Sequence, residues 1–303
     1  MIDNGNAIEV SGLVKQFGEN NAVDGVSISV PRGTTLGLLG PNGAGKSTTL
    51  KMLMGMLRPT AGTIHVLGME MPASAPKIKQ RIGYVPESHH IYRWMTVGEA
   101  LRFSRAMFES WNDELCNELL DLFQLPSDRR VRALSKGMLA KLSLLIALAH
   151  EPDLLVLDEP LSGLDPIARD DFIDGGMRGI CRDDRTVIFS SHQIDEVSRL
   201  ADSVAIMNAG RVLVHCSIEE LLGTAKRVRA VLHDGRLPDA VPANTIWQRV
   251  NRGEWLMTVH PFSDETVDRI RHENAVDDVQ VSALSLEDLF KDFVRGNREC
   301  SQH

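Results

Sequence analysis

The fold can be argued outward from one segment, Gly40-Pro41-Asn42-Gly43-Ala44-Gly45-Lys46-Ser47-Thr48. The segment matches the pattern GxxxxGK[ST] and lies between a strand-like run, TTLGLL, and a helix-like run, TLKMLMGML. Glycines let the backbone close around phosphate oxygens with its N–H groups pointing inward, and the following helix presents its positive N-terminal end. The segment therefore predicts a phosphate-binding loop, in which Lys46 reaches the β- and γ-phosphates of a nucleotide and Ser47 binds Mg²⁺.

A second motif, LLVLDE, occupies residues 154–159. Its apolar residues are typical of a buried strand, and Asp158 stands at the strand's end, where an acid can hold the magnesium ion of a nucleotide. Glu159 follows directly and is placed to polarise an attacking water as a general base. A strand that ends in Asp-Glu is, taken alone, more often a simple solvated strand end. Together with the phosphate-binding loop, the two acids favour nucleotide hydrolysis.

The chain up to residue 222 has the rhythm of an α/β protein, because short apolar runs alternate with helical patterns. Strands are predicted at 35–39, 82–85, 154–157, 187–190, 203–207 and 211–215. Helices are predicted at 49–57, 97–108, 113–123, 136–149 and about 218–222. Residues 97–150 hold little strand signal, so we expect a mainly helical insert there. Ligands of open α/β sheets sit at the carboxyl ends of strands, where both motifs lie.

The character of the sequence changes after Gly223. Strand-like runs at 227–235, 254–260 and 276–284 are accompanied by helix-like runs at 263–273 and 286–294. These runs predict a small α+β unit. We therefore expect two domains, a nucleotide-binding domain over residues 1–222 and an accessory domain over residues 223–303.

Composition argues against several classes of protein. The 33 Lys and Arg residues against 41 Asp and Glu give a net charge of −8, which disfavours binding of nucleic acid through overall basic charge. Four scattered cysteines fit reduced cytoplasmic thiols better than a disulfide framework or a zinc knuckle. No apolar run approaches the roughly 20 residues that cross a bilayer, and the first residues lack the pattern of a signal peptide. We expect a chain that does not itself span a membrane.

Further motifs stand in a fixed order around these two. They are Phe17, GYVPE at 83–87, LSKGM at 134–138, SGLDP at 162–166, and Ser191-His192 after the strand TVIFS. With these motifs the sequence resembles the ATP-binding subunits of ABC transporters over about residues 8–222. The resemblance implies the P-loop NTPase fold of the ABC cassette, with ATP and Mg²⁺ bound at the phosphate-binding loop.

The resemblance also implies a role for individual residues. Phe17 stacks on adenine, Glu159 activates water, and His192 holds the γ-phosphate. Glu87 occupies the Q-loop position, and Asp165 belongs to the D-loop. The signature, LSGGQ in the family, corresponds to Leu134, Ser135, Lys136, Gly137 and Met138.

In the family the signature of one subunit covers the ATP of another, which implies a second copy of this chain or a homologous ATP-binding subunit as a partner. Ser135 and the backbone of Gly137 would then contact the γ-phosphate in trans, at the positive N-terminal end of the helix that follows. Lys136 and Met138 depart from the signature, and Glu87 stands where many members carry Gln. None of these changes removes a group that the chemistry needs, so we expect a competent ATPase.

The first hypothesis for function is an ATPase that docks, at the cytoplasmic face of the membrane, on a separate integral-membrane permease. The LSKGM signature and the run LSLEDLF at 284–290 look most like the ATP-binding subunits of ABC-2-type exporters, which implies export. In the family the region of His89, His90, Tyr92 and Trp94 faces the membrane subunit. The transported substrate is not encoded in these motifs.

Two alternatives belong to other classes. A soluble ABC-type ATPase that acts on ribosomes or DNA would carry two cassettes with a charged linker, or long coiled coils that split the cassette, and this sequence has neither. A plain P-loop kinase would leave the signature and the D-loop without a role.

Overall fold

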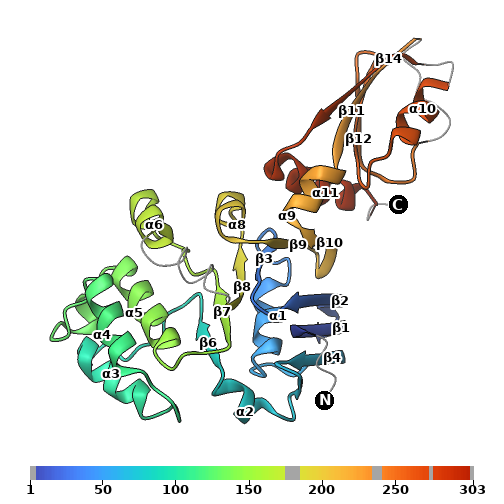
Figure 1. The fold of residues 1–303 in the computed structure, drawn as a ribbon. Helices are drawn as coiled ribbons and strands as arrows, with labels where there is room; N and C mark the ends of the chain where they lie inside the picture. Colours follow the sequence, from blue (N-terminus) through green and yellow to red (C-terminus); the bar gives the residue numbers. More distant parts are fainter. Residues whose placement is uncertain (1–4, 175–184, 234–240, 273–275, 301–303) are drawn as a thin grey trace. The chain divides into compact units, whose positions relative to one another are not determined.

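The computed structural model describes residues 5–174, 185–233, 241–272 and 276–300 (Figure 1). The chain divides into two compact units, Met1–His215 and Cys216–His303. This is a geometric division, and the two functional domains expected at 1–222 and 223–303 stay a prediction.

The first unit contains a six-stranded sheet of order β10-β9-β3-β8-β7-β6. Its strands are β3 (Thr35–Leu39), β6 (Ile82–Val85), β7 (Leu154–Asp158), β8 (Thr186–Ser191), β9 (Ser203–Asn208) and β10 (Arg211–Ser217). The pairs β3–β8, β3–β9, β6–β7 and β7–β8 are parallel. All residues of β3, β7 and β8 are buried, which explains the apolar runs that predicted them.

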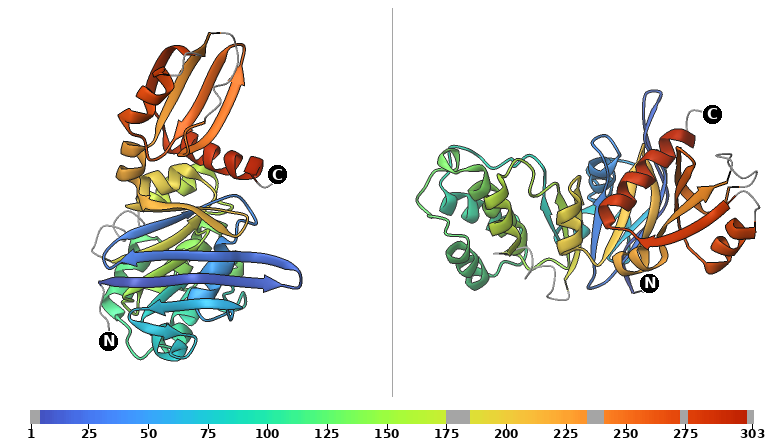
Figure 2. Two further views of the ribbon diagram at one scale, coloured as in Figure 1. Left: turned by 90° about the vertical axis from the view of Figure 1, so that its right-hand side faces the viewer. Right: turned by 90° about the horizontal axis from the view of Figure 1, so that it is seen from above.

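A second, antiparallel sheet of order β2-β1-β4-β5 belongs to the same unit. Its strands are β1 (Asn6–Phe17), β2 (Asn20–Pro31), β4 (Ala61–Val66) and β5 (Met69–Met71), and Figure 2 shows β1 and β2 as long neighbours. Buried residues of both sheets and of α1 (Lys46–Leu53) form one apolar core. The alternating pattern of β1 is interrupted by several register shifts against β2, and this sheet was not predicted from the sequence.

Three helices and a 3₁₀ turn fill the region predicted to be a helical insert, α3 (Val97–Arg105), α4 (Asp113–Leu122), η1 (Val131–Ala133) and α5 (Lys136–Leu148). They gather at one side of the first unit (Figures 1 and 2). Side chains at their N-termini fix where the helices begin. Thr96 forms a capping box with Glu99, and Asn112 and Ser135 each accept a backbone N–H bond.

Most predicted bounds agree with the structure to within a few residues, and α1 differs at both ends. It begins at Lys46 instead of Thr49 and ends at Leu53 instead of Leu57. The early start arises because Gly45, at φ +101°, turns the chain directly into the helix. The described part of the first unit also contains the short helices α2 (Ala75–Lys79), α6 (Pro166–Phe172) and α8 (Ile194–Leu200).

The second unit is an α+β fold. Its antiparallel sheet has the order β12-β13-β11-β14. The strands are β11 (Lys226–Leu232), β12 (Thr245–Asn251), β13 (Glu254–Val259) and β14 (Val276–Ala283). The helices are α9 (Ile218–Thr224), α10 (Asp264–His272) and α11 (Leu286–Cys300). Trp255 and Met257 lie at the centre of its separate core. β12 was not predicted, because its side chains are only half-buried or exposed. No helix in the described parts of the chain is long and apolar enough to cross a membrane.

Candidate functional site

Three neighbouring parallel strands bring the sequence motifs together. β8 lies between β3 and β7, with Leu39 opposite Ser191 and Asp158 opposite Ser190. The carboxyl ends of these strands therefore meet at one edge of the sheet. The phosphate-binding loop leaves β3 there, Glu159 follows β7, and His192 follows β8.

The phosphate-binding loop has a backbone that requires glycine at two positions. A Cβ atom at Gly45 would lie 2.6 Å from the carbonyl oxygen of Ala22, and one at Gly40 would lie 2.4 Å from that of Met207. Gly45 also has φ +101°, a conformation that side chains disfavour. Both glycines thus allow the loop to lie against neighbouring backbone.

This loop borders a cleft of about 570 Å³. Its lining is dominated by the loop and the start of α1, together with two acids and the turn after β9. The described residues that line it are Asn20, Asn21, Ala22, Asn42, Gly43, Ala44, Gly45, Lys46, Ser47, Thr48, Glu87, Glu159, Ala209 and Gly210. The size and the row of backbone N–H groups at a helix N-terminus suit a phosphorylated ligand.

Lys46 is buried within the loop that it follows. Its Nζ donates to the carbonyl oxygen of Gly40 at 2.7 Å and to that of Pro41 at 3.3 Å. The same Nζ lies 3.2 Å from Oε1 of Glu159, whose side chain is equally buried. A buried ammonium group is stable only beside such acceptors and an opposite charge.

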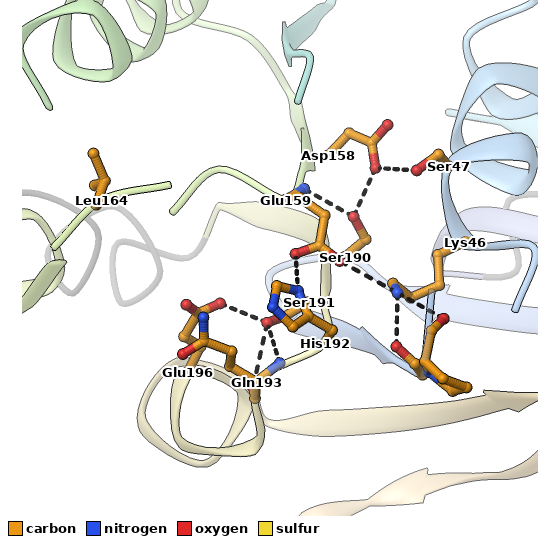
Figure 3. Close-up of polar contacts among 12 residues, drawn as sticks. Lys46, Ser47, Asp158, Glu159, Leu164, Ser190, Ser191, His192, Gln193 and Glu196 are labelled. Atoms are coloured by element: carbon orange, nitrogen blue, oxygen red, sulfur yellow. Dashed lines mark hydrogen bonds and ion pairs between the residues drawn. The ribbon is translucent and has the colours of Figure 1, made fainter. Parts of the chain in front are cut away.

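Asp158 is the acceptor of two hydroxyl groups, as Figure 3 shows. Ser47 Oγ and Ser190 Oγ each donate to Asp158 Oδ1 at 2.8 Å. Ser190 Oγ in turn accepts the backbone N–H of Glu159 at 2.9 Å. One buried serine therefore fixes both the carboxylate of Asp158 and the backbone of the residue that follows it.

Glu159 lies between two groups that carry or can acquire positive charge. Its Oε1 faces Lys46, and its Oε2 lies 2.7 Å from Nδ1 of His192 (Figure 3). The backbone of Glu159 has φ +49°, which is uncommon for a residue with a side chain and is typical of functional sites. His192 is partly exposed at the mouth of this arrangement.

The residues near Ser47 fit a magnesium ion of the kind that binds with a nucleotide. Ser47 lines the cleft, and its Oγ and the neighbouring Asp158 Oδ1 are adjacent hard oxygen donors. Among the residues that the structure describes, no cluster of three or more His, Cys, Asp or Glu side chains could hold a metal by itself.

Glu87 lines the cleft and also a neighbouring cavity of about 450 Å³ that contains Tyr84 and Asp158. Burial, together with the charges of Asp158 and Glu87, raises the pKa of Tyr84 to about 12. The carboxyl group predicted at the Q-loop position is therefore close to the predicted metal ligands, with a neutral phenol beside it.

Phe17 lies at the end of β1, and half of its surface is exposed. The Nζ of Lys15 is 5.0 Å from its ring centroid, a cation–π contact. Phe17 is not among the described residues that line the cleft, and its stacking on adenine stays a prediction.

The signature and the D-loop lie next to each other. A Cβ atom at Gly137 would lie 3.8 Å from Leu164 Cδ2, and one at Gly163 would lie 3.6 Å from Lys136 Nζ. Ser135 accepts the N–H of Met138 at 3.2 Å and caps α5. Asp165 caps α6 in the same way, through Ala168 N–H. Within the described part of the chain, neither motif lines the cleft of its own subunit.

Sequence reasoning missed several residues of the site. Ser190 was read only as part of a strand, and its role depends on the register that places it opposite Asp158. Asn20 and Asn21, at the start of β2, and Ala209 and Gly210, in the turn after β9, line the cleft from positions outside the loop. Gly210, at φ +79° after Ala209 at φ +48°, carried the available signal, an Ala-Gly pair between two strand-like runs.

Comparison with known proteins gives a consistent result. The family model described as "ABC transporter" matches residues 23–162. Nod factor export ATP-binding protein I of Ralstonia nicotianae is 38% identical over 220 residues, which cover 71% of this chain and 68% of the relative. The daunorubicin/doxorubicin resistance ATP-binding protein DrrA of Streptomyces peucetius is 34% identical over 290 residues, 93% of this chain and 84% of the relative.

Solved structures agree at the level of the fold. A structure described as the ATP-binding subunit of an ABC transporter covers 71% of this chain and 91% of its own length, with a TM-score of 0.64 and 28% identity. The dimeric structure of MJ0796, a bacterial ABC transporter cassette, covers 70% of this chain and 98% of its own, with a TM-score of 0.62 and 20% identity. With its cleft, its ordered motifs and these relatives, the chain belongs to the ABC transporter family, as an ATP-binding subunit.

Proposed function

We propose that this protein hydrolyses ATP with Mg²⁺ and thereby powers export through a separate membrane permease. The observation that carries the proposal is the position of Glu159 beside the phosphate-binding loop, between Lys46 and His192. A carboxylate in that place can act as a base on a water at the terminal phosphate.

Binding rests on the loop and on Lys46. The backbone N–H groups of the loop and the N-terminal end of α1 surround the phosphates, and the Lys46 ammonium neutralises their charge. Ser47 and Asp158 would hold Mg²⁺, which neutralises charge between the β- and γ-phosphates when bound. Ser190 keeps the Asp158 carboxylate turned toward Ser47.

Hydrolysis rests on Glu159 and His192. The Glu159 carboxylate accepts a proton from the attacking water, and the imidazole of His192 holds the carboxylate in place through the 2.7 Å contact of Nδ1 with Oε2. Lys46 contacts the other carboxylate oxygen of Glu159. The buried charge of Lys46 therefore serves both phosphate binding and the positioning of the base. Hydrolysis by Glu159 should therefore depend on a phosphate being bound at Lys46.

A second ATP-binding subunit completes the site. Ser135 and Gly137 lie with the D-loop and away from the cleft of their own chain, so they are free to cover the ATP of a partner copy. The helix α5 begins directly after Ser135, without an acidic residue in its first turn, and its N-terminal end would face the γ-phosphate. The dimeric cassette among the structural relatives supports this arrangement.

An exposed cluster of Tyr92, Trp94 and Phe103, which we name the aromatic patch, is the proposed docking site of the permease. Tyr92 lies 5.8 Å from Trp94 and 5.7 Å from Phe103, measured between ring centroids, and all three side chains are exposed. Exposed aromatic clusters of this kind mark protein interfaces. The patch follows Glu87 in sequence, so it is close to the nucleotide site along the chain.

Export is proposed from the named activities of the relatives, one of which is a Nod factor export protein and another a drug resistance protein. The match to DrrA extends through most of the second unit, which supports the same subfamily for the whole chain. The protein would act at the cytoplasmic face of the membrane, bound to its permease.

Purified protein tests the enzymatic half of this proposal, and detergent extracts of membranes test the other half. We expect hydrolysis of ATP that stops when EDTA removes Mg²⁺. We also expect the tagged protein to retain a polytopic membrane protein, identified by mass spectrometry, and the Trp94→Asp variant to lose it while keeping its ATPase activity. Retention of ribosomal proteins or DNA instead would contradict the permease assignment.

A further inference from the structure

The residues on either side of His192 belong to a network of buried polar groups that has no role in the proposed mechanism. Glu196, in the first turn of α8, has a side chain that is only 4% exposed. Its Oε2 accepts the hydroxyl of Ser191 at 2.5 Å, and its Oε1 lies 3.5 Å from Nε of Arg169 on α6. A buried carboxylate requires such partners, because burial without them strongly disfavours its charge.

Ser191 transmits this anchoring to the loop that carries His192. Its hydroxyl oxygen accepts the backbone N–H of Gln193 at 2.9 Å while its proton is directed to Glu196 (Figure 3). Its carbonyl oxygen accepts the N–H of Gly40, the first residue of the phosphate-binding loop, at 3.3 Å. The backbone is therefore fixed on both sides of His192.

Arg169 connects the same loop to the D-loop. One of its terminal nitrogens binds Oε1 of Gln193, and the other lies 3.5 Å from the carbonyl oxygen of Leu164. Its Nε has no hydrogen-bond partner among the described residues, so the contact with Glu196 is an electrostatic one. The guanidinium group thus spans α6, the D-loop and the loop of His192.

We propose that Arg169 and Glu196 are positioning residues that hold His192 against Glu159 and tie its loop to the D-loop. Neither touches the nucleotide cleft, so both act through His192. Burial raises the pKa of the Glu196 carboxyl group, opposed by the Ser191 hydroxyl and the charge of Arg169. Removal of Arg169 would favour a protonated Glu196 and loosen the network.

The chain offers a matched control on the same two helices. Arg199 of α8 binds Asp170 of α6 at 2.5 Å and Asp174 at 3.2 Å, and these contacts are exposed. This ion pair also joins α6 to α8, but it lies outside the contacts of Ser191 and Gln193. Arg199→Gln therefore removes a tie between the helices without disturbing the anchoring of His192.

Kinetics of full-length variants test the inference, which rests on the proposed hydrolysis. Glu196→Gln and Arg169→Gln should each lower kcat about 10- to 100-fold, because a displaced catalytic group costs rates of that order, with KM for ATP nearly unchanged. Arg199→Gln should keep kcat within about 2-fold, since exposed ion pairs contribute little. In a His192→Ala background, Glu196→Gln should cause no further loss.

Wild-type kcat in both variants, or a full additional loss in the His192→Ala background, would overturn the inference.

A measurement independent of turnover separates the inference from the proposed function. The ring ¹⁵N resonances of His192, identified by their absence in His192→Ala, should shift in Glu196→Gln and Arg169→Gln but not in Arg199→Gln. Unchanged resonances would overturn the inference, whereas a wild-type protein without ATPase activity would overturn only the proposed function.

Discussion

At the scale of single residues, the site consists of groups that restrain one another. Lys46 and Glu159 are both buried and lie 3.2 Å apart, and each would be costly to bury alone. Asp158 accepts from two serines. A change at any one of these positions therefore acts on its neighbours as well as on the ligand.

Lys46→Ala should weaken ATP binding about 10- to 100-fold, the value of a hydrogen-bonded charge on a phosphate. The change also leaves the Glu159 carboxylate without its cation, which adds repulsion toward the ligand. Isothermal titration calorimetry measures the effect. Lys51→Ala, an exposed lysine at the other end of α1, is the matched control and should bind as the wild type does. Equal affinity of the Lys46 variant would contradict the phosphate-loop assignment.

Ser190→Ala should lower the free energy of unfolding by about 1–3 kcal/mol, because the buried N–H of Glu159 loses its acceptor. It should also lower kcat, since Asp158 and Glu159 are both less restrained. Urea denaturation and ATPase assays measure the two effects. Ser27→Ala removes a similar acceptor of a backbone N–H, that of Gly12 at 2.9 Å, at an exposed position. If both variants behaved alike, Ser190 would have no special part in the site.

At the scale of elements, the conformation of the phosphate-binding loop depends on where α1 begins. Gly45 caps the helix in a left-handed conformation, so that Lys46 and Ser47 fall within the first turn. The sequence pattern specified the loop and its flanking elements, but it did not specify this start. Hydrophobic periodicity signals the buried face of a helix, and the first turn of α1 is polar.

The same Gly→Ala substitution at two positions tests whether the conformation of the phosphate-binding loop is required. Gly45→Ala should abolish ATP binding and destabilise the protein, because φ is +101° and the new Cβ would lie 2.6 Å from Ala22 O. Gly223→Ala, in α9, meets open space and should stabilise the protein by about 0.5–1 kcal/mol. Thermal unfolding and calorimetry provide both readings. Retained ATP binding in the Gly45 variant would show that the observed loop conformation is not required.

The strands that were predicted differ from those that were missed in how regularly their side chains are buried. β3, β7 and β8 are buried on both faces and give unbroken apolar runs. β1 carries register shifts and β12 is half-exposed, so neither has a clean pattern. For the site, Asp158 and Glu159 were predicted because they follow a predicted strand, and His192 was implied by the family resemblance. Ser190, Arg169 and Glu196 were not given roles, because their contacts depend on strand register and on helix packing.

At the scale of the whole molecule, the proposed function implies that one chain contains two separate parts of an ATP site. The cleft is lined by the phosphate-binding loop, Ser47 and Glu159, whereas the signature and the D-loop lie together elsewhere in the described residues. We therefore expect two subunits to bind two ATP molecules between them, in a symmetric arrangement.

Hydrolysis should consequently depend on the concentration of the protein. While monomers predominate, the rate should rise more steeply than in proportion to concentration, because a dimer must form before the base can act. A dilution series of the purified chain at saturating ATP checks this expectation. A rate strictly proportional to concentration at every dilution would indicate that a single chain is a complete enzyme, unless sedimentation shows a permanent dimer throughout.

Sedimentation of the Glu159→Gln variant with ATP and Mg²⁺ tests the central claim most directly. This variant should bind ATP without hydrolysing it and should sediment as a dimer, since we propose that the signature of each chain covers the nucleotide of the other. Adding Ser135→Arg to the same chain should leave it monomeric with ATP affinity kept, because Ser135 is remote from the cleft of its own chain. A double variant that still dimerises with ATP would contradict the account.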